Sequence, residues 1–548
     1  MYGVNMVRSE AIRPEPHPES CQSPEELVAL CDRLRTGGRL AADLFCGAGG
    51  LGLGLEKSGI RTVLGIDSDP EAAATHRALF PGLTIDDWDL GDGAVVKRVA
   101  DLIRSCGISV VVGGPPCQPF SRAGRSLLRE LVARGIRPEY DARQDLWLSF
   151  LAVVKHSEPE AVIMENVPDM ALDGETLIVR KMVHELERCG YTVEVEILDS
   201  FRFDVPQLRP RLILVALAGG RSFSFPTGST RGTPSLRDAI GDLPLLDGGP
   251  RFEFRDARSD PEGPPSASDT EYRFTSAGED TWVSFAEHDL DMIDDILGRL
   301  GWETTHPDPS EATNGDEPGA PRPTRQRSGL QSELAGDPEQ TGVGHVARQV
   351  RWDDRQIYEF MRWRRTECGV EDVRYRELPG RLKRYRDDIF DDKYKLLDYD
   401  KPSRTITAHI AKDGYWYIHP EASRTLTVRE AARIQTFPDR VQFAGTQSAA
   451  FRQIGNAVPP KLGEHLGTAV TEALRSDRKR THSTSEISHR LASWVVDRDR
   501  TLAPAGPPWL TIAVDALRGD RDDPDEVALH EEWLQFSAHE SRHGLKLG

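Results

Sequence analysis

The chain has 548 residues, of which 38% are hydrophobic, so we expect two or three folded domains rather than a wholly disordered protein. Its formal net charge of −19 by itself points away from nucleic acid, because phosphate binding normally needs a basic surface. That objection weakens if the acidic residues lie in tails and inserts. The cysteines include no CxxC pair, which argues against structural zinc or a disulfide framework. With no signal peptide and no apolar run of ~20 residues, we expect a cytoplasmic protein without a membrane partner or a bound metal.

Short apolar runs alternate with amphipathic stretches between residues 40 and 218. Helical patterns, such as those at 71–80 and 145–156, separate most of these runs. The last two runs have no helix between them, so a hairpin or a longer loop is expected there. This alternation predicts an α/β fold with a doubly wound, mostly parallel, Rossmann-like sheet. The predicted strands are LAADLF, TVLGID, SVVVGG, AVIMEN, TVEVEILD and RLILVALA.

The rest of the chain divides by composition. Two stretches, near 250–270 and 303–345, are rich in Pro, Gly, Ser and acidic residues, so we expect disordered inserts there. RTITAHI and YWYIHP, joined by KDG, suggest a hairpin. The expected parts are a flexible N-terminal tail (1–37), an α/β domain (38–220), a second, smaller region (221–450), a return segment (451–475) and a C-terminal extension of unknown role (476–548).

A glycine-rich loop, DLFCGAGGLGLG, follows the first strand and opens into a helix. Its glycines, Gly47, Gly49 and Gly50, let the backbone turn tightly and approach a ligand. Asp67, at the end of the second strand, can accept the hydroxyls of a ribose, or it can cap the next helix. Asp69 suits that capping role better because it precedes a proline. Asp89 can bind an adenine amino group or be an ordinary loop acid.

The segment GGPPCQPFS lies at the end of the predicted strand SVVVGG and carries Cys117. Its prolines restrict the loop and hold the thiol in one place, whereas Cys46 has the setting of an inert buried cysteine. A thiolate that adds to carbon 6 of cytosine makes carbon 5 nucleophilic, and an acid must then serve ring nitrogen 3. Glu165, in MENVPDM, can be that acid if it is protonated or shares a proton, or it can be paired with an arginine. Arg209 and Arg211 can bond the base carbonyl or brace the loop of Cys117.

These segments, in this order, resemble the DNA cytosine-5 methyltransferases. The resemblance rests on DLFCGAGG, GIDSDP, GGPPCQPFS, MENVPDM, VPQLRPR, RTLTVREAARIQTFPD and QIGNAVPP. It implies Cys117 as nucleophile, Glu165 on ring nitrogen 3 and Arg211 at a flipped-out cytosine. It also implies that Phe45, Asp67 and Asn456 surround S-adenosylmethionine. The region 221–450 then becomes a target-recognition region, and 451–475 completes the catalytic domain.

The resemblance further implies a monomeric bacterial modification methylase that acts on duplex DNA in the nucleoid, beside a restriction endonuclease that works separately. Two alternatives stay open: a transfer-RNA cytosine-5 methyltransferase, and a non-catalytic DNA-binding regulator on the same scaffold. The run of arginines and aromatic residues at 348–386 either holds the DNA backbone or forms a solvated amphipathic surface.

Overall fold

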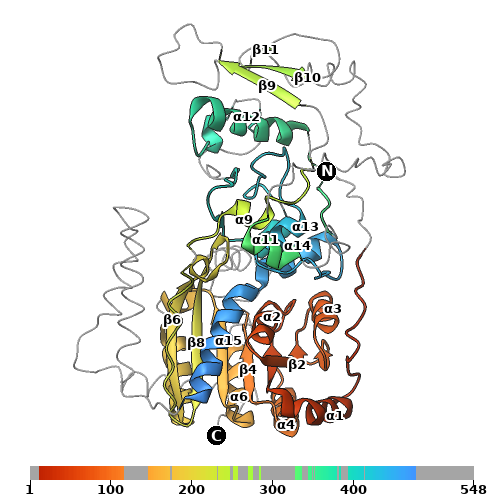
Figure 1. Cartoon of the computed structure of the whole chain (residues 1–548), viewed down its shortest axis with the longest axis vertical. Helices are drawn as coiled ribbons and strands as arrows, with labels where there is room; N and C mark the ends of the chain where they lie inside the picture. Colours follow the sequence, from red (N-terminus) through yellow and green to blue (C-terminus); the bar gives the residue numbers. More distant parts are fainter. Residues whose placement is uncertain are drawn as a thin grey trace, which may run out of the picture. The chain divides into compact units, whose positions relative to one another are not determined.

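Two compact units make up the protein in the computed structural model (Figure 1). The sheet unit comprises 12–233, 435–437 and 456–548, and the inserted unit comprises 1–11, 234–434 and 438–455. The structure describes residues 11–116, 146–172, 176–230, 232–246, 251–256, 270–275, 283–284, 327–335, 344–348, 350, 352–378, 382–383, 393–412 and 414–476. Cys117 and the extension 477–548 lie outside the described residues.

A seven-stranded sheet with the order β3-β2-β1-β4-β5-β8-β6 forms the centre of the sheet unit. All neighbouring strands are parallel except the pairs that involve β8, which runs antiparallel to both β5 and β6. The predicted doubly wound, mostly parallel sheet is therefore confirmed, and no α-helix separates β6 from β8. The strands are β1 (Arg39–Leu44), β2 (Ile60–Ile66), β3 (Leu83–Ile85), β4 (Val110–Gly113), β5 (Ala161–Asn166), β6 (Tyr191–Asp199) and β8 (Pro210–Ala218).

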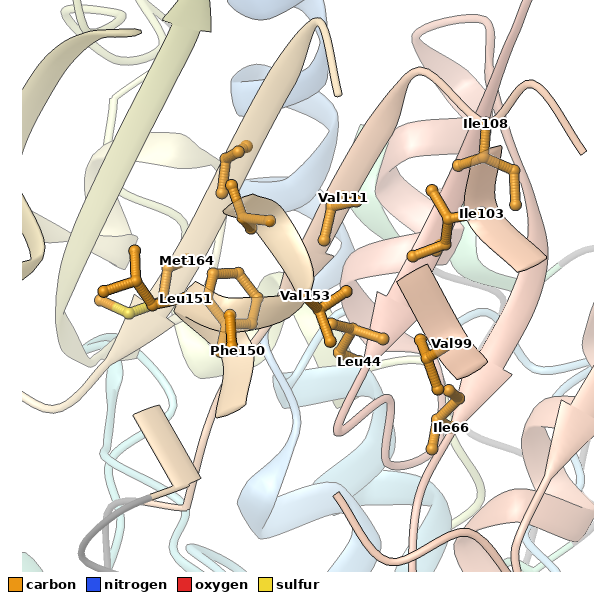
Figure 2. Close-up of a cluster of buried hydrophobic side chains, with 14 of the residues drawn as sticks. Leu44, Ile66, Val99, Ile103, Ile108, Val111, Phe150, Leu151, Val153 and Met164 are labelled. Atoms are coloured by element: carbon orange, nitrogen blue, oxygen red, sulfur yellow. The ribbon is translucent and has the colours of Figure 1, made fainter. Parts of the chain in front are cut away.

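Helices cover both faces of this sheet because its strands carry apolar side chains in alternation on each side. One cluster joins Leu44, Val111 and Met164 of the strands to helical residues such as Val99 and Phe150 (Figure 2). The other face packs against α2 and α15. The helices are α1 (Pro24–Leu34), α2 (Gly50–Lys57), α3 (Pro70–Leu79), α4 (Gly93–Ser105), α6 (Leu146–Ser157), α7 (Asp169–Leu172), α8 (Thr176–Arg188) and α15 (Pro460–Arg475), with 3-10 turns η1 (Arg35–Gly37) and η3 (Ser200–Phe203) and a short strand β7 (Gln207–Leu208).

The N-terminal segment corrects one prediction, because part of the expected flexible tail is an ordered helix. Ser23 caps α1 by accepting a hydrogen bond from the backbone N–H of Glu26, and Pro24 is its first residue. Leu27, Leu30 and Cys31 of this helix are buried in the same cluster as the sheet. Their spacing places them on one helix face, so apolar burial orders a segment whose polar composition suggested a tail.

The inserted unit contains short elements and a small antiparallel sheet. The sheet has the strand order β11-β10-β9. The elements are α9 (Leu236–Ile240), β9 (Arg251–Asp256), β10 (Thr270–Thr275), β11 (Val283–Ser284), α11 (Gly329–Ala335), α12 (Trp352–Cys368), η6 (Tyr375–Glu377), β12 (Ser403–Arg404), η8 (Ala408–Ala411), α13 (Val428–Ile434) and α14 (Gln447–Asn456), whose last residue falls in the sheet unit. No helix among the described residues is long and apolar enough to cross a membrane.

Both predicted disordered inserts contain ordered pieces, so those predictions are wrong in part. Residues 251–256 form β9, which pairs with β10 from Arg251↔Thr275 to Asp256↔Thr270. Residues 329–335 form α11, where Leu334 is buried and Gln331 donates a hydrogen bond to the carbonyl of Arg237 at 2.7 Å. Averaging composition over a long window hides such short segments. The remainder of each insert lies outside the described residues.

Part of the arginine and aromatic run at 348–386 packs inside the inserted unit, and whether the rest holds the DNA backbone or forms a solvated surface stays a prediction. Tyr358 and Phe360 of α12 are buried in the core of the inserted unit. Arg365 donates hydrogen bonds to the carbonyl oxygens of Leu396 and Leu397 at 2.9 and 2.6 Å. These side chains stabilise the unit internally, because a guanidinium can satisfy several carbonyl groups at once.

The hairpin predicted from RTITAHI and YWYIHP does not form. Residues 405–407 are irregular, and η8 follows them. A side chain replaces the strand ladder: the Tyr417 hydroxyl donates to the carbonyl of Thr405 at 2.8 Å and accepts from the N–H of Thr407 at 3.1 Å. The two segments therefore lie side by side, as the pattern suggested, without pairing as strands.

Candidate functional site

The glycine-rich loop leaves β1 in a left-handed conformation that few residues adopt. Phe45 has φ 58°, Gly47 φ 52° and Gly49 φ 79°. A non-glycine residue such as Phe45 in this region costs on the order of 1–3 kcal/mol and persists only where the surrounding structure holds it. The Cys46 N–H donates to the carbonyl of Ile66 at 3.0 Å, which ties the loop to the end of β2.

Close packing explains two of the loop glycines, and open space surrounds the third. A Cβ on Gly49 would lie 2.3 Å from the ring of Phe80, and one on Gly50 would lie 2.2 Å from the carbonyl oxygen of Val458. A Cβ on Gly47 would meet nothing within 4 Å. The loop thus packs closely behind Gly49 and Gly50 and leaves room at Gly47, as a ligand-binding loop requires.

Asp67 holds the end of β2 against this loop. Its Oδ2 accepts a hydrogen bond from the N–H of Gly47 at 2.8 Å, and its Oδ1 accepts from the N–H of Asp69 at 2.8 Å. Burial raises the pKa of Asp67, and these two hydrogen bonds oppose that increase. Asp69 is the residue that caps α3, accepting from the N–H groups of Glu71 and Ala72. The helix-cap alternative for Asp67 is therefore wrong, and its carboxylate belongs to the loop.

Asp43, the first residue of the motif, is an acid whose importance the sequence analysis missed. It is only 2% exposed, and its Oδ2 has no hydrogen-bond partner among the described residues. Burial raises its pKa well above the ordinary value, and the nearby charge of Asp67 raises it further. A buried carboxyl oxygen without a partner at the end of a strand is costly unless a ligand completes it. The sequence signal was its position directly before the glycine-rich loop.

Asp89 and Cys46 have simpler settings. Asp89 is exposed, and its Oδ1 accepts a hydrogen bond from the N–H of Gly91 at 2.8 Å, so it stabilises its own turn. This is the ordinary loop acid that the sequence left open, and any contact with adenine stays a prediction. Cys46 is buried, and burial raises its thiol pKa well above the ordinary value. Cys46 is therefore an inert cysteine, as predicted.

Glu165 lies at the end of β5 against the loop that leads to Cys117. A Cβ built on Gly114 would be 3.1 Å from Glu165 Oε2. The next residue, Asn166, donates from its Nδ2 to the carbonyl of Pro115 at 3.1 Å. Cys117 itself is outside the described residues, but Gly114 and Pro115 precede it by only three and two positions. Glu165 is thus held beside the segment that carries the predicted nucleophile.

Arg211 is the partner of Glu165. Its Nε lies 2.6 Å from Glu165 Oε1, and each side chain is 11% exposed. The antiparallel register of β5 and β8, with Asn166 opposite Leu212, brings the two side chains together. The alternative of an arginine-paired carboxylate is therefore what the structure contains. The same geometry gathers an acid and a guanidinium where a base could meet both, and a charge-assisted pair holds them in position.

Arg209 bonds to the return segment, whereas Arg211 pairs with Glu165. It is 1% exposed and donates from Nη2 to the carbonyl of Ala457 at 2.8 Å. Gln435 donates to the same carbonyl at 2.7 Å and is also bonded to Gln207. Arg209 thus braces the return segment, whereas the sequence placed it at the base or behind the loop of Cys117. The sequence analysis did not single out Gln207 or Gln435, which lie in two of the quoted motifs.

The return segment reaches the glycine-rich loop just after Asn456. Val458 packs its carbonyl against Gly50, and Ala457 lies beside the same glycine. Asn456 itself is exposed at the end of α14. Ala457 and Val458 therefore pack against the glycine-rich loop, while the exposed side chain of Asn456 is available to a ligand. Among the residues that the structure describes, no cluster of three or more His, Cys, Asp or Glu side chains could hold a metal ion.

Known proteins match most of this chain. The family described as C-5 cytosine-specific DNA methylase matches residues 41–249 and 317–472. Type II methyltransferase M.AgeI of Thalassovita gelatinovora is 31% identical over 455 residues, covering 79% of this chain and 99% of that protein. Type II methyltransferase M.Bpa9945I of Bacillus paralicheniformis is 28% identical and covers 69% and 74% of the two chains. Type II methyltransferase M1.HphI of Haemophilus parahaemolyticus is 27% identical and covers 78% and 85%.

Proposed function

The chain belongs to the C-5 cytosine-specific DNA methylases and is a DNA cytosine-5 methyltransferase, and from this premise we propose that Cys117 is its nucleophile and S-adenosylmethionine its methyl donor. The observation that carries the proposal is the placement of the Glu165–Arg211 pair against Gly114, three residues before Cys117. Glu165, Arg211 and the residues that lead to Cys117 lie together at one end of the sheet.

The proposed chemistry begins when the Cys117 thiolate adds to carbon 6 of a cytosine. Glu165 must first take up a proton, because a carboxylate paired with Arg211 has none to donate. The protonated acid then gives a hydrogen bond or the proton to ring nitrogen 3, so that the ring becomes an enamine with its electron pair at carbon 5. S-adenosylmethionine, when bound, supplies an electrophilic methyl group to that carbon. Loss of the proton from carbon 5 then restores the ring and expels the thiolate. Arg211 keeps Glu165 in place and can hydrogen-bond the base carbonyl.

The glycine-rich loop fits a donor of this kind. The open space at Gly47 and the buried, unpartnered Oδ2 of Asp43 are what a ligand-binding loop needs. In this proposal Asp67 serves the ribose hydroxyls and Asp89 the adenine amino group. The remaining donor-site residues are Phe45, Gly49, Gly50 and Asn456.

The proposed substrate is a cytosine within a specific duplex sequence, flipped out of the helix at a cost of a few kcal/mol. The relatives described above carry type II methyltransferase names, which supports a modification methylase. The proposal places it in the cytoplasm of a bacterium, as a monomer that acts apart from a restriction endonuclease. A transfer-RNA methyltransferase and a non-catalytic regulator are the rivals. Intact Cys117, Glu165 and Arg211 argue against the regulator.

The test is Cys117→Ser with duplex DNA that contains 5-fluorocytosine. The wild type should be trapped as a covalent complex, because fluorine replaces the proton that must leave carbon 5. The serine variant should lose turnover and trapping yet bind S-adenosylmethionine almost unchanged. Transfer RNA should take up no tritium from labelled donor. Comparable methylation by the serine variant would refute the covalent mechanism, and label mainly in RNA would favour the rival.

A further inference from the structure

Trp416 stands out in the inserted unit as a large aromatic residue that is 37% exposed. Most large apolar side chains that the structure describes are buried, so an exposed indole needs a reason. The guanidinium carbon of Arg404 lies 4.6 Å from the centre of its ring. A cation over an indole face is held there by the ring quadrupole. Arg404 and Trp416 thus form a stacked pair at the surface of this unit.

The backbone on both sides of this pair is held rigidly. The Tyr417 hydroxyl, one residue after Trp416, bonds to the carbonyl of Thr405 and to the N–H of Thr407. Gly455 packs closely against the same segment, since a Cβ added to it would be 2.3 Å from the carbonyl carbon of Thr407. The segment next to Arg404 therefore has little freedom, and the guanidinium is preorganised for a ligand.

The charge of Arg404 is not neutralised within the described residues. It has no ion pair there, and its Nη1 is a buried donor that has no hydrogen-bond acceptor among these residues. Arg237 provides a contrast in the same unit: its guanidinium lies 4.6 Å from the ring centre of Tyr399, but its Nε is also 3.0 Å from Asp400 Oδ1. Both guanidinium groups are thus stacked on an aromatic ring, and of these two Arg404 is the one without a carboxylate partner among the described residues.

We propose that Arg404, positioned by Trp416, binds a backbone phosphate of the DNA substrate. The proposal rests on the DNA methyltransferase function and assigns a specific contact to the inserted unit. A duplex presents phosphates at regular spacing, and arginine recognises them through its planar set of N–H donors. A phosphate contact carries no sequence information, so Arg404 strengthens binding to any duplex and does not select the methylated site.

The test measures binding of the full chain to two duplexes, one with its methylated site and one unrelated, over a range of salt concentrations. Arg404→Gln should weaken binding to both by a similar factor. It should also make the slope of log K against log salt shallower by about 0.9, the loss expected for one phosphate contact. Arg404→Lys should restore most of the slope because it keeps the charge.

The matched control is Arg237→Gln, which should leave the slope unchanged because Asp400 already neutralises Arg237. An Arg404→Gln slope equal to that of the wild type would overturn the proposal. Weaker binding to the methylated site alone would also overturn it, since that result means base recognition. Binding of duplex DNA by the wild type reports on the function itself, so failure of the function is distinguishable from failure of this contact.

Discussion

Glu165 and Arg211 form a largely buried ion pair at the proposed catalytic site. Removing one partner of a buried ion pair leaves an uncompensated charge and costs about 3–5 kcal/mol. A cytosine that enters the site must therefore contact Glu165 and Arg211 while these two side chains remain paired. Either substitution is expected to reduce stability as well as turnover, so activity loss alone would not identify the acid.

His76 provides a prediction about stability and pH. It is buried beside β2 and the glycine-rich loop: a Cβ on Gly65 would lie 2.3 Å from its ring and a Cβ on Gly49 would lie 3.1 Å from it. The Phe80 ring lies tilted against it, with ring centres 4.5 Å apart. Burial, with a smaller contribution from the charge of Arg77, lowers the pKa of His76 from 6.5 to about 3. Below pH 6.5, His76 therefore binds a proton in the unfolded chain but stays neutral in the folded protein. Between these two values, each pH unit downwards should cost up to about 1.4 kcal/mol of folding free energy.

Urea unfolding of the wild type and of His76→Gln at a series of pH values checks this expectation. The glutamine variant is less stable at neutral pH, but its free energy of unfolding should fall less steeply below pH 6.5. His156→Gln, a change at an exposed position of the same unit, should keep the wild-type slope. Equal slopes in the wild type and His76→Gln would show that His76 is not held neutral.

At the scale of elements, α11 is a short helix inside a stretch whose composition suggests disorder. Ser328 donates from Oγ to the carbonyl of Asp238 at 2.8 Å and so fixes the start of the helix. Leu334 is buried, and its carbonyl accepts from the N–H of Asp439 at 2.8 Å. These contacts connect α11 to α9 and to the segment after α13, so the helix is part of the packed inserted unit.

Two deletions separate the helix from the rest of the stretch. Replacing 306–326 with a short Gly/Ser bridge should leave stability and methylation nearly unchanged, because it removes none of these contacts. Extending the deletion to 342 removes α11 and should lower the melting temperature and the activity. Leu334→Ala should produce part of the effect, about 2–5 kcal/mol for a buried leucine. Thermal unfolding measures all three, and an unaffected longer deletion would contradict the role given to α11.

At the scale of the whole molecule, chemistry and specificity are expected to reside in different units. The predicted catalytic and donor residues fall in the sheet unit, whereas 346–420 falls in the inserted unit. Exchanging 346–420 for the corresponding segment of a relative should change the methylated site and retain Cys117 chemistry. Bisulfite mapping of a test plasmid reports the site. An unchanged site in an active exchange variant would place recognition elsewhere in the chain.

The sequence by itself determined the central sheet and the position of its loops. Each strand of that sheet is a short apolar run, and burial on both faces makes such a run recognisable without knowledge of its partners. The strand β3 was not among the predicted strands, because it has only three residues, Leu83–Ile85. The ordered motifs were equally local, and they were sufficient to identify the family.

Tertiary structure alone decided which side chains meet. Arg209 bonds to Ala457, 248 positions away, and Glu165 pairs with Arg211 rather than standing alone. Residues 24–34 and 329–335 fold because apolar partners elsewhere bury them, although their surroundings in the sequence are polar. Such contacts depend on the path of the chain between distant segments. A local pattern records what a residue can do, whereas packing and register determine which partner it has.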